Sequence, residues 1–239
     1  MRNVSLTFHS GQKTAIVGRN GSGKTTFIKL LCRLYDPTEG QILLNDIDIR
    51  RYDYRQYLSI LAVVFQEFRL LSFGLGQNIA SNMNYDSEKA GRCLEQVGFG
   101  ERLHKLPLGL STVLYKVFDE TGVTISSGEA QKIALARALY KEEAFLIILD
   151  EPTAALDPKA ESEIYGKMNE MTDGKTAIFI SHRLSSCRFC RNIIVFHEGE
   201  LVQCGSHEEL VADKSGEYYE LWNAQAQYYT SPESREITL

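Results

Sequence analysis

Residues 14–26 read TAIVGRNGSGKTT, and this stretch decides the class of fold to expect. A short run from Thr14 to Val17 is followed by a loop with glycines at 18, 21 and 23, and apolar residues then recur at helical spacing over 24–35. The loop matches the pattern G-x-x-x-x-G-K-[ST]. Glycines let backbone N–H groups close around an anion at a helix N-terminus. The stretch therefore predicts a strand, a phosphate-binding loop and a helix.

The predicted phosphate contacts come from the loop and the start of the helix: Arg19, Asn20, Gly21, Ser22, Gly23, Lys24, Thr25 and Thr26. We expect Lys24 to reach the outer phosphates and the Thr25 hydroxyl to bind Mg²⁺. A dinucleotide-binding loop is disfavoured, because its third glycine is replaced by Thr26. A simple glycine turn with a surface lysine is the structural alternative.

A second signal lies at the end of the apolar run 145–149, where Asp150 and Glu151 follow. The run is typical of a central parallel strand, and α/β sheets bind ligands at the carboxyl ends of such strands. Asp150 is suited to orienting Mg²⁺, and Glu151 to positioning or deprotonating the attacking water. Standing alone, the pair would be a solvated turn.

Composition describes an ordinary globular protein of 239 residues with 44% hydrophobic residues and a net charge of −5. This charge argues against a surface that binds nucleic acid mainly by neutralising phosphates. No apolar run approaches the roughly 18 residues of a membrane-spanning helix. Cys187 and Cys190 are spaced as a C-x-x-C pair without a second Cys or His pair, so we favour two ordinary thiols over a metal or redox site.

Apolar runs and helical spacings alternate along the chain, which predicts an α/β fold with a mostly parallel sheet. The predicted strands and short apolar runs are 4–8, 14–17, 41–44, 61–65, 145–149, 176–180, 193–196 and 201–203. The predicted helices are 24–35, one from 54 onward, 129–140, 159–171 and 206–227. The middle of the chain, from about 67 to 123, is predicted to be an inserted helical region.

Four further motifs resemble one family of phosphate-loop ATPases. They are VFQE at 64–67, ISSGEAQKIALARAL at 125–139, LDEPTAALD at 149–157 and SHR at 181–183. With the phosphate loop, they stand in the order found in ATP-binding domains of ABC transporters, and the resemblance covers essentially the whole chain. The sequence around Phe65 and Gln77 is similar to that of exporter-type half-transporters.

The resemblance implies a P-loop core with an N-terminal antiparallel β-subdomain and an inserted α-helical subdomain. It implies one domain over 1–239, with the core at 1–66 and 133–229, the helical subdomain at 67–132 and a flexible tail at 230–239. ATP and Mg²⁺ are the implied cofactors, and the implied Mg²⁺ ligands are Thr25, Gln66 and Asp150. Glu151, His182 and Gln66 are the implied catalytic residues, and Asp157 belongs to the loop that communicates across a dimer.

In this family the signature residues bind the phosphate held by an opposite ATP-binding domain, in a head-to-tail dimer. These residues are Ser126, Ser127, Gly128 and Glu129. The family usually has glycine in place of Ser127 and glutamine in place of Glu129, so we expect turnover to be slower at most. The adenine-stacking aromatic residue of the family normally precedes the position of Met1, which predicts a longer polypeptide.

The implied partners are a transmembrane domain, fused upstream, and a second ATP-binding domain, with no nucleic acid. The implied location is the cytoplasmic face of a membrane. The function predicted is ATP hydrolysis that drives export. Two alternatives remain: a soluble ABC ATPase acting on ribosomes or nucleic acid, and a nucleotide-gated binding module with poor turnover.

Overall fold

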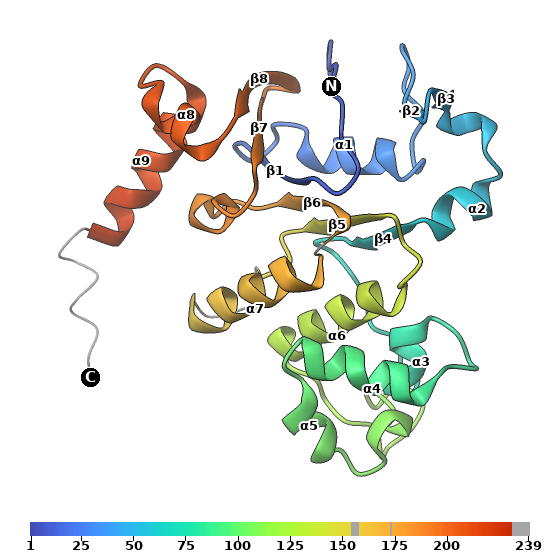
Figure 1. Cartoon of the computed structure of the whole chain (residues 1–239). Coiled ribbons are helices and arrows are strands. Elements are labelled where there is room, and N and C mark those ends of the chain that lie inside the picture. Colours follow the sequence, from blue (N-terminus) through green and yellow to red (C-terminus); the bar gives the residue numbers. More distant parts are fainter. Residues whose placement is uncertain (154–157, 173, 231–239) are drawn as a thin grey trace. The chain divides into compact units, whose positions relative to one another are not determined.

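The computed structural model describes residues 1–153, 158–172 and 174–230 (Figure 1). The chain forms two compact units, one of Met1–Leu58 with Lys175–Leu239 and the other of Ser59–Gly174. No described helix is both long enough and apolar enough to cross a membrane.

The first unit is built on strands β6 (Thr176–Ile180), β1 (Lys13–Val17), β7 (Asn192–His197) and β8 (Glu200–Gly205), hydrogen-bonded in that order. Strand β1 pairs in parallel with β6 on one side and with β7 on the other, and β7 pairs antiparallel with β8. Every residue of β6 is buried, which explains its uniformly apolar sequence. The sheet therefore holds the end of β1, where the phosphate loop begins, between two parallel neighbours.

Shorter elements complete this unit. The helices are α1 (Lys24–Leu31), α2 (Tyr54–Ser59), α8 (His207–Ala212) and α9 (Glu217–Thr230), and an antiparallel pair is formed by β2 (Leu43–Leu44) and β3 (Ile47–Asp48). Figure 1 shows α8 and α9 following β8 at the C-terminal end of the described chain.

The second unit joins a parallel strand pair to a group of helices. The strands are β4 (Leu61–Val64) and β5 (Leu146–Asp150), and the helices are α3 (Leu75–Ala80), α4 (Ser87–Gln96), α5 (Gly100–His104), α6 (Ser127–Tyr140) and α7 (Pro158–Met171). Helix α6 packs against α3, α4 and β4, and buries Ile133, Ala134 and Leu135. Arg137 of α6 donates a 2.7 Å hydrogen bond to the carbonyl of Asn78 in α3, which ties the two helices together.

The α/β class with a mostly parallel sheet and a small antiparallel pair is confirmed. The predicted subdomain boundaries after residues 66 and 132 stay a prediction. The predicted tail at 230–239 lies outside the described residues apart from Thr230, the last residue of α9.

Three local predictions were wrong. Residues 4–8 form no strand, since they pair with no strand in the part of the chain that the structure describes. The helix expected over 24–35 ends at Leu31, because Arg33 adopts a left-handed φ of 52° and its guanidinium donates to the Tyr52 carbonyl. The helix expected over 206–227 is two helices, since Asp213 accepts hydrogen bonds from Ser215 and Gln203 at the break between them.

Candidate functional site

The phosphate loop has a backbone that suits glycine. Gly18, Gly21 and Gly23 have φ values of 147°, 78° and 102°, which side chains rarely adopt. At Gly18 a Cβ atom would also overlap the carbonyl oxygen of Phe196 in β7. Gly18 is therefore required by the close approach of two backbones as well as by its own conformation.

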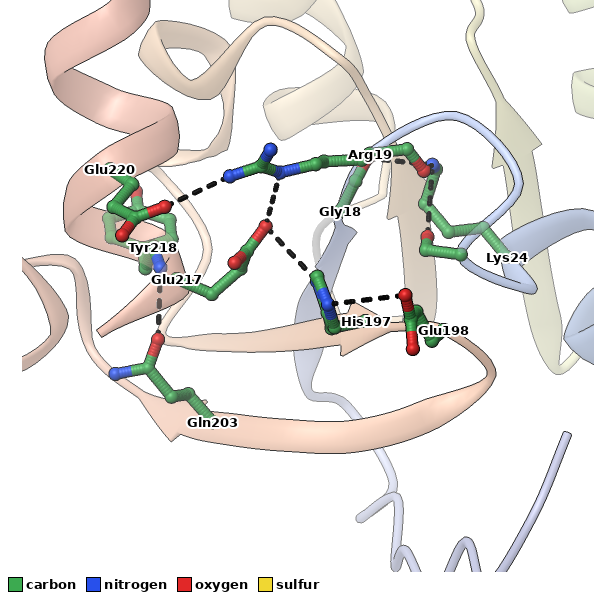
Figure 2. A network of polar contacts seen from close by, with 10 residues as sticks. Gly18, Arg19, Lys24, His197, Glu198, Gln203, Glu217, Tyr218 and Glu220 are labelled. Carbon is green, nitrogen blue, oxygen red and sulfur yellow. Dashed lines mark hydrogen bonds and ion pairs between the residues drawn. The ribbon is translucent and has the colours of Figure 1, made fainter. Parts of the chain in front are cut away.

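Lys24 is the first residue of α1, and its side chain folds back over the loop (Figure 2). Its ammonium group donates to the carbonyls of Gly18 and Arg19 at 2.8 and 2.9 Å, and only 6% of the residue is exposed. The loop thus presents a buried cation beside the N-terminus of α1, where a helix carries partial positive charge. Thr25 and Thr26 follow as exposed residues of the first turn.

Arg19 of the loop is held by helix α9. Its Nε lies 2.6 Å from the carboxylate of Glu217, and an amino group lies 2.9 Å from that of Glu220 (Figure 2). Glu217 also lies 3.3 Å from Nδ1 of His197 at the end of β7. Hydrogen bonding to Glu217 raises the pKa of the Arg19 guanidinium, so the loop residue is a permanent cation tied to α9.

His182 lies in the loop that follows β6, as predicted, and this loop shares a cavity with the phosphate loop. The cavity has a volume of about 380 Å³ and is lined by Gly18, Arg19, Asn20, Ser181, His182, Leu184, Leu221 and Gln225. The fold therefore brings the predicted histidine and two predicted phosphate contacts, Arg19 and Asn20, to one hollow.

The second unit brings Asp150, Glu151 and Gln66 together. Asp150 is the last residue of β5 and is 2% exposed. Glu151 has a left-handed φ of 49°, which is uncommon outside glycine. Its carboxylate accepts a 2.8 Å hydrogen bond from the Gln66 amide, and its backbone carbonyl accepts one of 3.0 Å from Gln131 of α6. Both its side chain and its backbone are therefore fixed.

The predicted signature residues form the start of α6. The Ser126 hydroxyl accepts from the backbone N–H of Glu129 at 3.2 Å, and the Glu129 carboxylate accepts from the N–H of Ser126 at 2.9 Å. This capping box satisfies two N–H groups that a helix start would otherwise leave without partners. Ser127 and Gly128 are the first two residues of the helix.

Glu129 also faces Arg102 of α5, whose Nε lies 2.7 Å from its Oε1 but is poorly aligned for a hydrogen bond. Burial raises the pKa of the Glu129 carboxyl, but the Ser126 hydrogen bonds and the Arg102 charge outweigh burial and hold it below its usual value. The carboxylate at this signature position is thus paired with a cation that sequence reasoning did not identify.

Several predicted residues supply hard oxygen donors. Thr25 has a hydroxyl, Gln66 an amide carbonyl and Asp150 a carboxylate at a strand end. A magnesium ion prefers such oxygen donors and keeps several waters. Taken by itself, each of these donors is of the kind that suits Mg²⁺.

Two other sequence predictions have different outcomes, and three contacts were not predicted. Asp157 lies outside the described residues. Cys187 and Cys190 are buried free thiols, and burial raises the pKa of both, that of Cys187 to about 12. A buried thiol with a raised pKa holds little of the reactive thiolate form at neutral pH. Gln225, Glu217 and Arg102 contact predicted site residues, but no sequence motif marked them.

Comparisons with known proteins agree on one family. Residues 1–154 match the model of the ABC transporter family. The chain is 37% identical over 228 residues to the mitochondrial iron-sulfur clusters transporter ATM1 of Candida glabrata, covering 94% of this chain and 31% of that protein. It is 41% identical over 214 residues to the subtilin transport ATP-binding protein SpaT of Bacillus subtilis, covering 88% and 34%.

The solved structure of a bacterial Atm1-family ABC exporter with ATP bound superimposes on this chain with a TM-score of 0.83 at 33% identity. The match covers 90% of this chain and 37% of that one. The chain spans about a third of the length of the curated relatives it matches. These matches show that the chain belongs to the ABC transporter family, as its ATP-binding, ATPase domain.

Proposed function

We propose that the chain binds the phosphates of ATP in the loop 18–25 and hydrolyses ATP with the residues gathered at Glu151. The observation on which this rests is the buried Lys24 ammonium, folded over a glycine loop at the start of α1. An ammonium and inward N–H groups at a helix N-terminus stabilise phosphate charge.

Each residue has a distinct role in this proposal. Lys24 binds the outer phosphates. Thr25, Asp150 and Gln66 would hold Mg²⁺, and a bound Mg²⁺ would supply positive charge against the charge that develops on the phosphates. Glu151, oriented by Gln66, accepts a proton from the attacking water or positions it.

The remaining sites complete the proposal. His182 contacts the outermost phosphate from the loop after β6. The signature residues 126–129 bind the phosphate of a second ATP-binding domain in a head-to-tail dimer, and Asp157 communicates across it.

We further propose that this hydrolysis powers export through a transmembrane domain, with the chain at the cytoplasmic face of the membrane. Support comes from the similarity to an iron-sulfur clusters transporter, an ATP-dependent lipid A-core flippase and a bacterial Atm1-family ABC exporter. The net charge of −5 gives no support to a nucleic-acid partner.

The test is steady-state ATP hydrolysis by the intact protein, comparing wild type with Glu151→Gln and Lys24→Ala. Loss of a general base lowers rates by about 10² to 10⁴. We expect Glu151→Gln to lose hydrolysis at this scale while still binding ATP, and Lys24→Ala to lose binding. Negligible hydrolysis by the wild type would instead favour a nucleotide-gated binding module. ATP-dependent uptake by vesicles containing the intact protein then tests export.

A further inference from the structure

Helix α9 forms one wall of the cavity beside the phosphate loop. Leu221 and Gln225 line this cavity together with the loop that contains His182. Glu217, Leu221 and Gln225 are spaced by four residues, so they form one stripe along the helix. The same face of α9 therefore reaches the phosphate loop at one end and the His182 loop at the other.

The Gln225 side chain spans the His182 loop with two hydrogen bonds. Its Nε2 donates to the backbone carbonyl of His182, and its Oε1 accepts from the N–H of Leu184 at 3.0 Å. The N–H of Arg183, which lies between these two backbone groups in the chain, donates to the Ser181 hydroxyl at 3.0 Å. One planar amide thus fixes the peptide groups on both sides of Arg183.

The helix that bears Gln225 is itself anchored. The Tyr218 side chain is fully buried, and its hydroxyl lies 2.9 Å from Nδ1 of His207 in α8. The N–H of Tyr218 donates to Gln203 of β8 at 2.9 Å (Figure 2). With Arg19 bound by Glu217 and Glu220, the first turn of α9 is tied to β8, α8 and the phosphate loop. Gln225, two turns further on, therefore holds the His182 loop from a fixed support.

We propose that Gln225 is a positioning residue for His182 in ATP hydrolysis. The His182 side chain is exposed, and its backbone carbonyl is the group that Gln225 holds. A displacement of about 1 Å in a reacting group can lower a rate by about 10²-fold. Gln225 acts through this placement and touches no reacting atom. The inference rests on the proposed hydrolysis and on the role of His182 in it.

The experiment uses the intact protein with two substitutions of similar shape. Gln225→Met removes both hydrogen bonds, and Gln225→Glu keeps the acceptor for Leu184 but sets a carboxylate against the His182 carbonyl. Asn223→Ala is the matched control, because residue 223 lies on the same helix but off the stripe of Glu217, Leu221 and Gln225. We measure ATP affinity, KM and kcat, with the fraction of folded protein determined for each variant.

We expect Gln225→Met and Gln225→Glu to lower kcat by about ten-fold or more, with ATP affinity within about two-fold of wild type. Asn223→Ala keeps both values. A general loss of structure would lower ATP affinity and the folded fraction together. Unchanged kcat in Gln225→Met, or equal losses in the Asn223→Ala control, would overturn the proposal.

A double-substitution cycle separates this inference from the function on which it rests. Single-turnover release of labelled phosphate is measured for His182→Ala with and without Gln225→Met, over times long enough for slow variants. If Gln225 acts through His182, the second substitution leaves the rate unchanged. A further drop overturns the positioning role but leaves the proposed hydrolysis intact. A wild-type rate in His182→Ala instead refutes the role of His182 itself, and with it the inference.

Discussion

The side-chain amide of Gln66 donates a 2.8 Å hydrogen bond to the carboxylate of Glu151, although the two residues are 85 positions apart in the chain. Gln66 follows β4 and Glu151 follows β5, so the parallel pairing of these strands brings their carboxyl ends to one edge. This bond and the Gln131 contact fix a carboxylate whose backbone is in a left-handed conformation. The orientation of Glu151 is thus set by Gln66 at its side chain and by Gln131 at its backbone carbonyl.

Removal of the Gln66 amide should impair hydrolysis more than binding. In Gln66→Ala the Glu151 carboxylate loses its orienting donor, and we expect kcat to fall by about ten-fold or more, while ATP still binds. Gln66→Glu sets a second carboxylate beside Glu151 and is expected to lose more. Stopped-flow nucleotide binding and steady-state hydrolysis check both values, and a wild-type kcat in Gln66→Ala would show that this bond is dispensable.

The close approach at Gly18 predicts a large steric effect of a single methyl group. Gly18→Ala should lower the free energy of unfolding by about 1 to 3 kcal/mol for overpacking, in addition to its backbone strain, and should abolish ATP binding. Gly11→Ala is the control, because Gly11 also has a positive φ, of 75°, but no atom lies within 4 Å of its added Cβ. Thermal unfolding of both variants isolates the steric part, and equal losses would contradict it.

The Arg102 and Glu129 pair predicts a charge effect at the signature. Arg102→Ala leaves the Glu129 carboxylate without its nearest cation, so we expect weaker ATP-dependent dimerisation, since the signature then repels phosphate. The double variant Arg102→Ala with Glu129→Gln should recover dimerisation, because glutamine keeps the cap without the charge. Light scattering with ATP measures the effect, in the Glu151→Gln background in which we expect hydrolysis to be lost. Failure of the second substitution to rescue would exclude a charge mechanism.

The cluster around His207 predicts a pH dependence of stability. His207 is buried against Trp222 and Tyr218, and burial first, then the charge of Arg188, lower the pKa of its imidazole, while Glu208 opposes them. The unfolded chain therefore takes up the proton first. The neutral His207 imidazole therefore contributes to the free energy of unfolding. This contribution is fully present above the pKa of about 6.5 that His207 has in the unfolded chain, and it is lost as the pH falls through the lower pKa of the folded state.

Chemical denaturation between pH 5 and 8 measures this dependence. His207→Asn keeps a polar group for Tyr218 without the titration, so its stability should vary less with pH over this interval. His9→Asn, a change at an exposed histidine, should leave the slope as in the wild type. An unchanged slope in His207→Asn would assign the dependence to another group.

Local patterns predicted the elements that the core buries. Strand β6 occupies the predicted residues 176–180, because a strand buried on both faces has an unbroken apolar sequence. The end of α1 and the break after Ala212 were missed, since each depends on a side chain that bonds a backbone or side chain outside the helical pattern. Residues 4–8 have the composition of a strand, but pairing decides whether a strand forms.

In the candidate site, too, some residues could be predicted from local sequence patterns and others could not. Lys24, Asp150, Glu151 and His182 stand in motifs, so their positions at strand ends and helix starts were readable from sequence. Gln225 and His182 are 43 residues apart, and Arg102 is 27 residues before Glu129 in another helix. Contacts of this kind are set by tertiary packing, and they have no local signature.

The left-handed backbone of Glu151 has a consequence for engineering. Substitution by glycine would relieve about 1 to 2 kcal/mol of conformational cost, against about 0.5 to 1 kcal/mol from the greater freedom of the unfolded chain. A selection for thermostability alone would therefore tolerate or even favour loss of this carboxylate. Directed evolution of a more stable domain needs an activity screen in every round, because the substitution of Glu151 that favours stability removes the carboxylate that we propose for turnover.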